Sequence, residues 1–173
     1  MKKIAVFGKP GSGKSTFSAQ LASLAGIPLY QIDTMVFNAD GSQVMRSKFD
    51  EAHNTILKSE SWILDGLGPI GHFQQRIACA DTLIYIDLPY ALSYWLVTKR
   101  LLQGVYQKPQ GWPDGCSLVK GTVQSYKFLG QSRQFWSESF YQSLKASAKE
   151  KTLYRVQTLN TLNGLLEVLV PQR

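Results

Sequence analysis

The sequence has few of the residues that build disulfide frameworks or metal clusters. Its 173 residues include two histidines and only two cysteines, Cys79 and Cys116. The cysteines form no C-x-x-C pair and have no histidine cluster beside them, so neither a disulfide scaffold nor a zinc site is predicted. Two isolated cysteines fit a reducing compartment, and we expect a cytoplasmic protein.

Long apolar runs are also lacking. The first residues, MKKIAVF, contain two lysines but only a four-residue apolar run, too short for a signal peptide or a membrane span. No later run approaches the roughly 20 apolar residues that a spanning helix needs. With 44% hydrophobic residues the chain can bury one full core, and we expect a single domain over residues 1–173.

Acidic residues are scarce in one part of the chain, which carries the whole excess of the net charge of +7. Residues 1–98 hold eight basic and eight acidic side chains, whereas residues 99–155 hold ten basic and three acidic ones. This asymmetry fits a nucleic-acid surface, and it equally fits a basic cover that closes over a triphosphate. Composition does not separate these two interpretations.

One stretch near the start of the chain carries a specific motif. An apolar run, Ile4 to Phe7, leads into GKPGSGKS at residues 8–15, which fits the pattern G-x-x-x-x-G-K-[ST]. A helix-period pattern of apolar residues follows at Phe17, Leu21 and Leu24. The order of strand, glycine-rich loop and helix predicts a phosphate-binding loop.

The residue types of this loop match the chemistry of a bound nucleotide. Glycines let successive backbone N–H groups surround a phosphate, and the following helix directs its unpaired N–H groups at the same anion. Lys14 would reach the β- and γ-phosphates, and the Ser15 hydroxyl would ligate Mg²⁺ in preference to Thr16, one position beyond. The expected nucleotide-binding residues are Gly8, Pro10, Gly11, Ser12, Gly13, Lys14, Ser15 and Thr16.

Strand and helix patterns alternate along the whole chain. After the first strand, further strands are expected at 27–32, 62–64, 82–86 and 153–156. One helix is expected to begin at Ser47, and a short one to run through Phe73 and Ile77. Further helices are expected over 90–103, 117–129, 131–150 and 159–169. Residues 34–46 and 105–117 are predicted to be loops. This alternation predicts an α/β fold of three layers, in which helices cover both faces of a five-stranded parallel sheet.

Three aspartates follow predicted strands. Asp33 and Asp65 stand where the carboxyl end of a strand faces the ligand crevice of an open α/β sheet. Asp65 is the stronger Mg²⁺ candidate because Gly66 leaves room for a ligand. Asp87 ends a similar apolar run, but Leu88-Pro89 follows it, and we interpret it as the cap of the next helix.

Several other polar and aromatic residues have ordinary structural interpretations. His72, just after the loop at 65–71, fits contact with an acceptor phosphate, but a lone loop histidine is more often a solvated side chain; His53 is expected on the polar side of its helix. The late basic residues, Lys145, Lys149, Lys151 and Arg155, are interpreted as an exposed basic face. The aromatic residues of 128–141 recur near helical spacing and are expected in the core. Tyr106 and Trp112 fit base stacking and packing within a lid equally well.

The motifs occur in an order that resembles a known family. The chain reads GKPGSGKST, then Ile32-Asp33, WILDG at 62–66, Arg76 ahead of ADT, IDLP at 86–89, Lys99-Arg100, and PDGC at 113–116. This series is similar to the adenylate-kinase-related P-loop proteins that are often labelled DNA topology modulation proteins. The resemblance implies a nucleoside-monophosphate-kinase-like core that binds ATP and Mg²⁺, with a lid over about residues 104–135.

The resemblance also implies roles for individual residues. Asp33 and Asp65 look like the carboxylates that organise the Mg²⁺ water shell or contact the acceptor. Arg76 looks like an acceptor-side or transition-state arginine, and Arg100 like the arginine at the base of the lid. The implied catalytic residues are Lys14, Asp33, Asp65, Arg76 and Arg100, and the implied metal site consists of Ser15, Asp65 and Asp33. Arginines suit phosphoryl transfer because they bind the developing charge bidentately.

The chain departs from this family on the acceptor side. Adenylate kinases typically read D-G-F-P-R where this chain has DGLGP at 65–69, so residues 67–72 contain no arginine. Val105 and Gln107 occupy positions where the related proteins usually have basic residues, and Lys108, Lys120 and Arg133 are the candidates to substitute. An arginine finger contributes about 10³–10⁵ in rate, so efficient adenylate kinase activity is not expected.

Two hypotheses follow for the function. The first is a Mg²⁺-dependent phosphotransferase that moves the ATP γ-phosphoryl group to a nucleotide or another small hydroxyl or phosphate acceptor. The alternative is an ATP-gated regulatory protein, in which nucleotide binding orders the basic segment 99–155 for a DNA or protein partner. The acceptor itself is not predictable, because acceptor pockets of this fold consist of variable loops.

Overall fold

A five-stranded sheet forms the centre of the protein. The computed structural model describes residues 1–38, 42–104, 106–107, 109, 112 and 115–170. All neighbouring strands are parallel, in the order β2-β3-β1-β4-β5, which confirms the predicted sheet. The strands are β1 (Lys3–Gly8), β2 (Leu29–Gln31), β3 (Trp62–Asp65), β4 (Thr82–Ile86) and β5 (Thr152–Val156).

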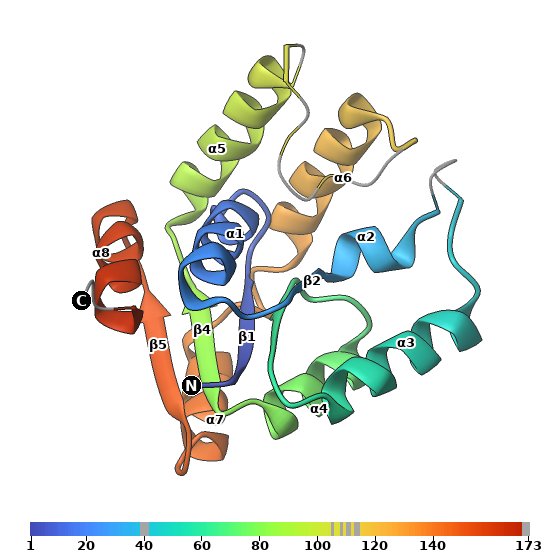
Figure 1. The fold of residues 1–173 in the computed structure, drawn as a ribbon. Coiled ribbons are helices and arrows are strands. Elements are labelled where there is room, and N and C mark those ends of the chain that lie inside the picture. Colours follow the sequence, from blue (N-terminus) through green and yellow to red (C-terminus); the bar gives the residue numbers. More distant parts are fainter. Residues whose placement is uncertain (39–41, 105, 108, 110–111, 113–114, 171–173) are drawn as a thin grey trace.

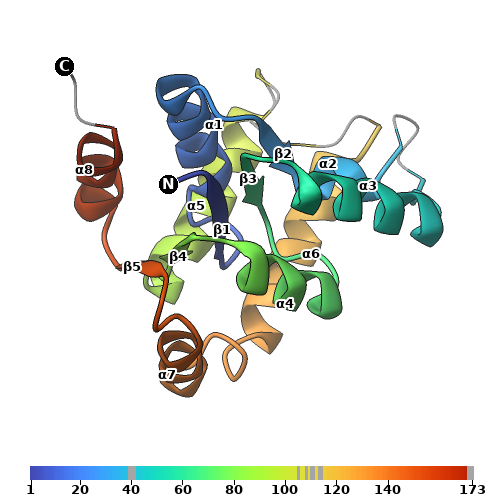
Figure 2. The same cartoon turned by 60° about the horizontal axis from the view of Figure 1, so that its bottom comes forward.

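Helices cover both faces of this sheet, as the alternating pattern predicts. Figures 1 and 2 show α1 and α8 on one face and α3, α4 and α7 on the other, with α5 beside α6 beyond the carboxyl ends of the strands. No helix within the described ranges is long and apolar enough to cross a membrane. The helices are α1 (Lys14–Ala25), α2 (Ile32–Val36), α3 (Arg46–Lys58), α4 (Ile70–Cys79), α5 (Tyr90–Gln103), α6 (Leu118–Gln131), α7 (Glu138–Ser147) and α8 (Leu159–Leu169).

The buried core has two halves because successive strand residues point to opposite faces. On β1, Ile4 and Val6 belong to the cluster that contains residues of α1 and α8, whereas Ala5 and Phe7 belong to the cluster under α3, α4 and α7. The second cluster is rich in aromatic rings: Phe7 stacks on Tyr85 at 5.6 Å between ring centroids. The predicted core position of the aromatic residues of 128–141 is confirmed for Trp136, which is buried, and Phe135, Phe140 and Tyr141 pack against the same cluster. It is wrong for Phe128 on α6, which is exposed.

Several predicted boundaries are wrong. Helix α3 begins at Arg46 after Met45, without a side-chain cap, and not behind Ser47. The break between α6 and α7 lies at 132–137, because Ser137 caps α7 by accepting from the Phe140 N–H, and Gly130 lies inside α6. The segment expected to be irregular after Asp33 begins with the short helix α2, and its predicted turn at 40–41 lies outside the described residues.

The buried face of α5 also differs from the prediction. Periodicity assigns Leu92, Trp95, Leu96 and Leu102 to this face, but Trp95 is 55% exposed and Leu102 64% exposed. Ser93 and Val97 are the fully buried residues of the helix. Ser93 and Val97 form the surface on which the phosphate-binding loop packs. The buried face of α5 therefore includes a small polar residue, Ser93, which a pattern of apolar residues does not indicate.

Gly8 joins β1 to this loop in a conformation that only glycine adopts readily. Its φ is +151°, and a Cβ on it would overlap the carbonyl oxygen of Ile86, its partner on β4. By contrast, Gly164 lies in the exposed part of α8, and a Cβ there would meet nothing within 4 Å. A methyl group would therefore overlap the neighbouring strand at Gly8 but would contact nothing at Gly164.

We expect Gly8→Ala to lower the free energy of unfolding by about 2 kcal/mol or more, through backbone strain and overlap with β4. Gly164→Ala should raise it by up to about 1 kcal/mol, because alanine is the better helix former. Urea unfolding monitored by circular dichroism measures both variants. Equal stability of Gly8→Ala and the wild-type protein would contradict this account of the β1 end.

Candidate active site

The sheet register brings the two predicted carboxylates to one edge. Asp65, the last residue of β3, pairs with Val6 on β1 and with Gln31 on β2. Asp33 follows Gln31 by two residues, and a Cβ built on Gly66 would lie 3.9 Å from its Oδ1. Asp65 and Asp33 thus lie next to the start of the phosphate-binding loop, as the strand ends predict.

The loop itself has the backbone that phosphate binding requires. Gly11 and Gly13 have φ values of +68° and +79°, so the chain curls and turns its N–H groups inward. A Cβ on Gly11 would lie 2.5 Å from the carbonyl oxygen of Ser93 and 2.6 Å from Cγ2 of Val97, so the loop packs directly on α5. Helix α1 begins at Lys14 with no side-chain cap, which leaves its first N–H groups available to an anion.

Lys14 is held by the loop itself. Its Nζ donates to the carbonyl oxygen of Lys9 at 2.8 Å and to Oγ of Ser12 at 3.4 Å. Burial lowers the pKa of Lys14, and the charges of Asp65 and Asp33 oppose this shift. The ammonium is therefore bonded to the loop and lies near enough to both carboxylates to be affected by their charge.

Asp65 is a buried carboxylate with unused bonding capacity. Only 4% of its surface is exposed, and among the described residues its Oδ1 has no hydrogen-bond partner. Burial raises its pKa to about 6, although Lys14 and a hydrogen bond with Ser15 act in the opposite direction. A buried carboxylate oxygen without a partner is costly, so this atom fits a role toward a bound cation or its water.

The residues present fit Mg²⁺ better than a metal held by protein ligands alone. The described ranges contain no group of three or more His, Cys, Asp or Glu side chains placed to hold a metal ion. Mg²⁺ usually keeps several waters and binds one or two carboxylates together with substrate phosphates. Ser15, Asp65 and Asp33 provide such a set beside the loop.

Arg76 lies close to these carboxylates but bonds to the chain itself. It is 1% exposed, and its Nη2 donates to the carbonyl oxygens of Gly66, at 3.1 Å, and Leu67. Burial lowers its pKa to about 10, while Asp65 and Asp33 oppose that shift. Among the described residues no carboxylate lies within 4.0 Å of its guanidinium. The arginine thus holds the 66–67 loop and carries a buried charge without a direct counter-ion.

Both histidines lie in a buried cluster next to Arg76, so their interpretation as solvated side chains is wrong. His53 is fully buried, and its Nε2 lies 3.4 Å from Nη1 of Arg76. Burial, and to a smaller extent the charge of Arg76, lowers the pKa of His53 to about 4. His72 is 8% exposed, with its Nε2 2.8 Å from Oδ1 of Asp50. Phe49, His53 and Ile56 share one face of α3, a spacing that the sequence already contains.

Arg100 links α5 to α6 above the carboxylates. Its Nη2 donates to Oγ of Ser125 at 3.0 Å, and its guanidinium lies 4.7 Å from the ring centroid of Trp112. Burial lowers its pKa, and Asp33 opposes the shift. Trp112 is packed under Arg100 with its Nε1 bonded to the Cys116 carbonyl, whereas Tyr106 is 92% exposed.

The basic residues that could substitute for the missing arginines differ in position. Arg133 lies with its guanidinium 5.3 Å from the ring centroid of Tyr90, at the start of α5. Lys120 is exposed on α6, and Lys108 and Val105 lie outside the described residues. Of the two described candidates, Lys120 and Arg133, it is Arg133 that lies beside the start of α5, just beyond the carboxyl end of β4.

Two predicted structural roles near the site are wrong. Helix α5 is capped at Pro89 and not by Asp87, whose Oδ2 instead accepts from Nε and Nη2 of Arg155 at 3.0 and 2.8 Å. Arg155 and Lys151 are not part of an exposed basic face, since Lys151 donates to three carbonyls at the end of α4. The ion pair of Asp87 was not foreseeable from either segment alone.

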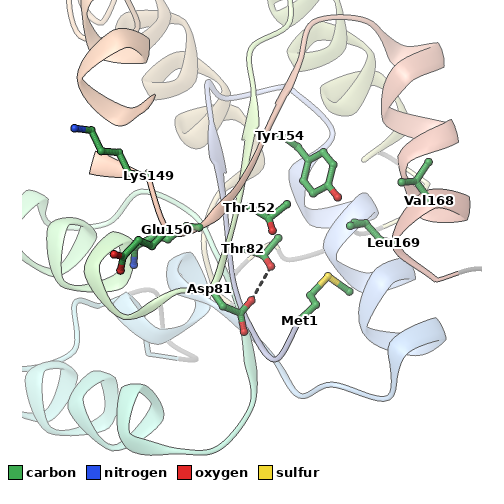
Figure 3. Close-up of a pocket in the computed structure, with 10 residues that line it drawn as sticks. Met1, Asp81, Thr82, Lys149, Glu150, Thr152, Tyr154, Val168 and Leu169 are labelled. Carbon is green, nitrogen blue, oxygen red and sulfur yellow. Dashed lines mark hydrogen bonds between the residues drawn. The ribbon is translucent and has the colours of Figure 1, made fainter. Parts of the chain in front are cut away.

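A separate hollow of about 690 Å³ lies at the opposite edge of the sheet. Figure 3 shows Met1, Thr82, Thr152 and Tyr154 around it. Two of its charged side chains are bonded within the fold: Asp81 accepts from two backbone N–H groups, and Lys151 has the carbonyl partners named above.

Comparison with solved structures finds proteins of similar fold. The chain is similar to a shikimate kinase from Acinetobacter baumannii in complex with shikimate, with 14% identity, a TM-score of 0.57, and coverage of 98% of this chain and 93% of that one. It is also similar to a shikimate kinase from Bacteroides thetaiotaomicron, with 13% identity, a TM-score of 0.55, and coverage of 96% and 97%. No protein-family model and no curated protein sequence matches the chain. The α/β P-loop NTPase fold is therefore confirmed.

The raised pKa of Asp65 predicts a stability effect with a definite sign. The folded protein binds this proton more tightly than the unfolded chain, so the free energy of unfolding falls as the pH rises from about 4 to about 6. Asp65→Asn removes this penalty and should raise the free energy of unfolding at pH 8 by about 1–3 kcal/mol, with little gain at pH 4.

Urea unfolding of both proteins across this pH range measures the effect. The lowered pKa of His53 adds stability with rising pH, which is the opposite slope, so the quantity to follow is the difference between variant and wild type. His53 contributes equally to both proteins and cancels. A difference that does not change with pH would contradict the burial of an ionisable Asp65.

Proposed function

We propose that the protein is a Mg²⁺-dependent phosphotransferase that moves the γ-phosphoryl group of ATP to a small acceptor with a hydroxyl or phosphate group. The observation that carries this proposal is Asp65, a buried carboxylate with one oxygen unpartnered among the described residues, next to Lys14 and Ser15. The fold it shares with two shikimate kinases supports the proposal, since those proteins act on a small hydroxyl compound by name.

The loop residues would bind the donor. Backbone N–H groups of residues 8–16 other than Pro10, including those at the start of α1, would surround the β-phosphate. Lys14 would exchange the carbonyl of Lys9 for phosphate oxygens, and its positive charge there would stabilise the charge that develops on the transferred group. Ser15 and Asp65 would hold Mg²⁺, whose charge would neutralise the phosphate oxygens.

The acceptor would enter beside Asp33. This carboxylate is exposed, unlike Asp65, and lies next to Gly66 at the mouth of the loop that Arg76 holds. We assign to Asp33 the orientation of the attacking hydroxyl and to Asp65 the metal side. The buried charge of Arg76 favours an acceptor with an anionic group, because an anion nearby would compensate it. Arg100 and helix α6 would cover the donor.

The test is an acceptor screen with the purified protein, ATP and Mg²⁺. Nucleoside monophosphates, nucleosides, shikimate and simple sugar alcohols are offered singly, and acceptor-dependent ADP is measured together with the phosphorylated product by mass spectrometry. We expect at least one anionic acceptor to give product. ATP binding without acceptor-dependent ADP from any compound would contradict the proposal and favour the ATP-gated alternative.

Two variants assign the roles in this assay. Lys14→Ala should lower kcat/KM by about 10²–10³ through loss of charge stabilisation, and Asp33→Asn by at least about tenfold through loss of acceptor orientation. Glu167→Gln, on the exposed face of α8, is the matched control and should retain wild-type rates. An Asp33→Asn protein as active as the control would remove Asp33 from the mechanism.

A further inference from the structure

The phosphate-binding loop contains a second lysine, and its side chain points away from where phosphate would bind. Lys9 occupies the second position of the motif, yet only 2% of its surface is exposed. Its Nζ forms an ion pair with Oδ1 of Asp87 beneath the loop. The ring of Tyr90 lies 4.8 Å from the same nitrogen and thus covers the pair from α5.

Both carboxylate oxygens of Asp87 accept hydrogen bonds from cationic side chains. Its Oδ1 accepts from Lys9, and its Oδ2 accepts from Arg155 of β5 through two N–H groups, at 2.8 and 3.0 Å. Arg155 is held in turn by Glu138 at 2.8 Å and by the ring of Tyr141 at 4.2 Å. An aspartate with both oxygens engaged in this way is unsuited to bind a metal, although it ends an apolar strand beside the loop.

The pairing follows from the sheet register. Gly8 lies opposite Ile86 in the parallel ladder of β1 and β4, so the next residues, Lys9 and Asp87, leave the sheet side by side. A buried ion pair adds little net stability compared with apolar residues of the same size, but it fixes geometry because each charge is costly without the other. The pair therefore constrains the position of the Lys9 peptide more than it stabilises the fold.

The constrained peptide is the one that contacts the phosphate-binding lysine. The Lys9 carbonyl accepts from Nζ of Lys14 at 2.8 Å, so the side chain of one lysine fixes the group that holds the other. We propose that Lys9 and Asp87 are positioning residues: their ion pair holds the phosphate-binding loop and Lys14 in the geometry that receives the polyphosphate of ATP. This inference rests on ATP as the ligand of the loop, as proposed above.

The experiment compares Lys9→Met with the wild-type protein by calorimetric titration with Mg²⁺-ATP and with inorganic tripolyphosphate. The fold should persist in Lys9→Met, because Arg155 still neutralises Asp87. We expect the Kd for ATP to rise at least about tenfold, and the Kd for tripolyphosphate by the same factor, since the loss arises at the phosphates. Lys2→Met, which breaks the exposed ion pair with Glu60, is the matched control and should bind both ligands like wild type.

Asp87→Asn and the double variant complete the comparison. If the two residues act as one pair, the double variant binds ATP no more weakly than the weaker single variant. Losses that add fully, an unchanged Kd in a folded Lys9→Met protein, or a loss for ATP without one for tripolyphosphate would each overturn the inference. None of these measurements needs turnover, so a protein that binds ATP but phosphorylates nothing would refute the proposed function and leave this inference intact.

Discussion

The parallel pairing of β1 with β3 and β4 is the constraint on which the site depends. It aligns Val6 with Asp65 and Gly8 with Ile86, so residues from three distant segments leave the sheet at one edge. Gly8 lets the chain turn there without overlapping β4. Asp65 and the start of the phosphate-binding loop take their positions from these two alignments. Helix α5 then packs directly on the loop.

The charges gathered at this edge are poorly compensated by the neighbouring described side chains. Asp65 holds a carboxylate oxygen without a partner among the described residues, and Arg76 holds a buried guanidinium bonded only to neutral groups. Lys14 is bonded to a carbonyl and a hydroxyl. Such an arrangement lowers stability, but it keeps the groups desolvated and oriented for a charged ligand, which is where electrostatic stabilisation is strongest.

Features that follow from local patterns or from the rule for strand ends were predicted from the sequence, whereas side-chain pairs between distant segments were missed. The loop motif, the five strands and the convergence of Asp33 with Asp65 follow from local patterns and from the rule for strand ends. The pairs of Lys9 with Asp87 and of His53 with Arg76 do not, because the two partners lie in different segments and no local pattern links them. For His53 a signal existed, since it shares a helical face with Phe49 and Ile56.

The contact of Gly11 with Ser93 and Val97 has a mechanical consequence for α5. Because the backbone of Gly11 approaches that of Ser93 so closely, the first two turns of α5 cannot rotate without displacing the phosphate-binding loop. A bend that moves the carboxyl-terminal half of α5 would therefore have to lie beyond Val97. Arg100 lies in that half and bonds to α6, so it would move together with α6.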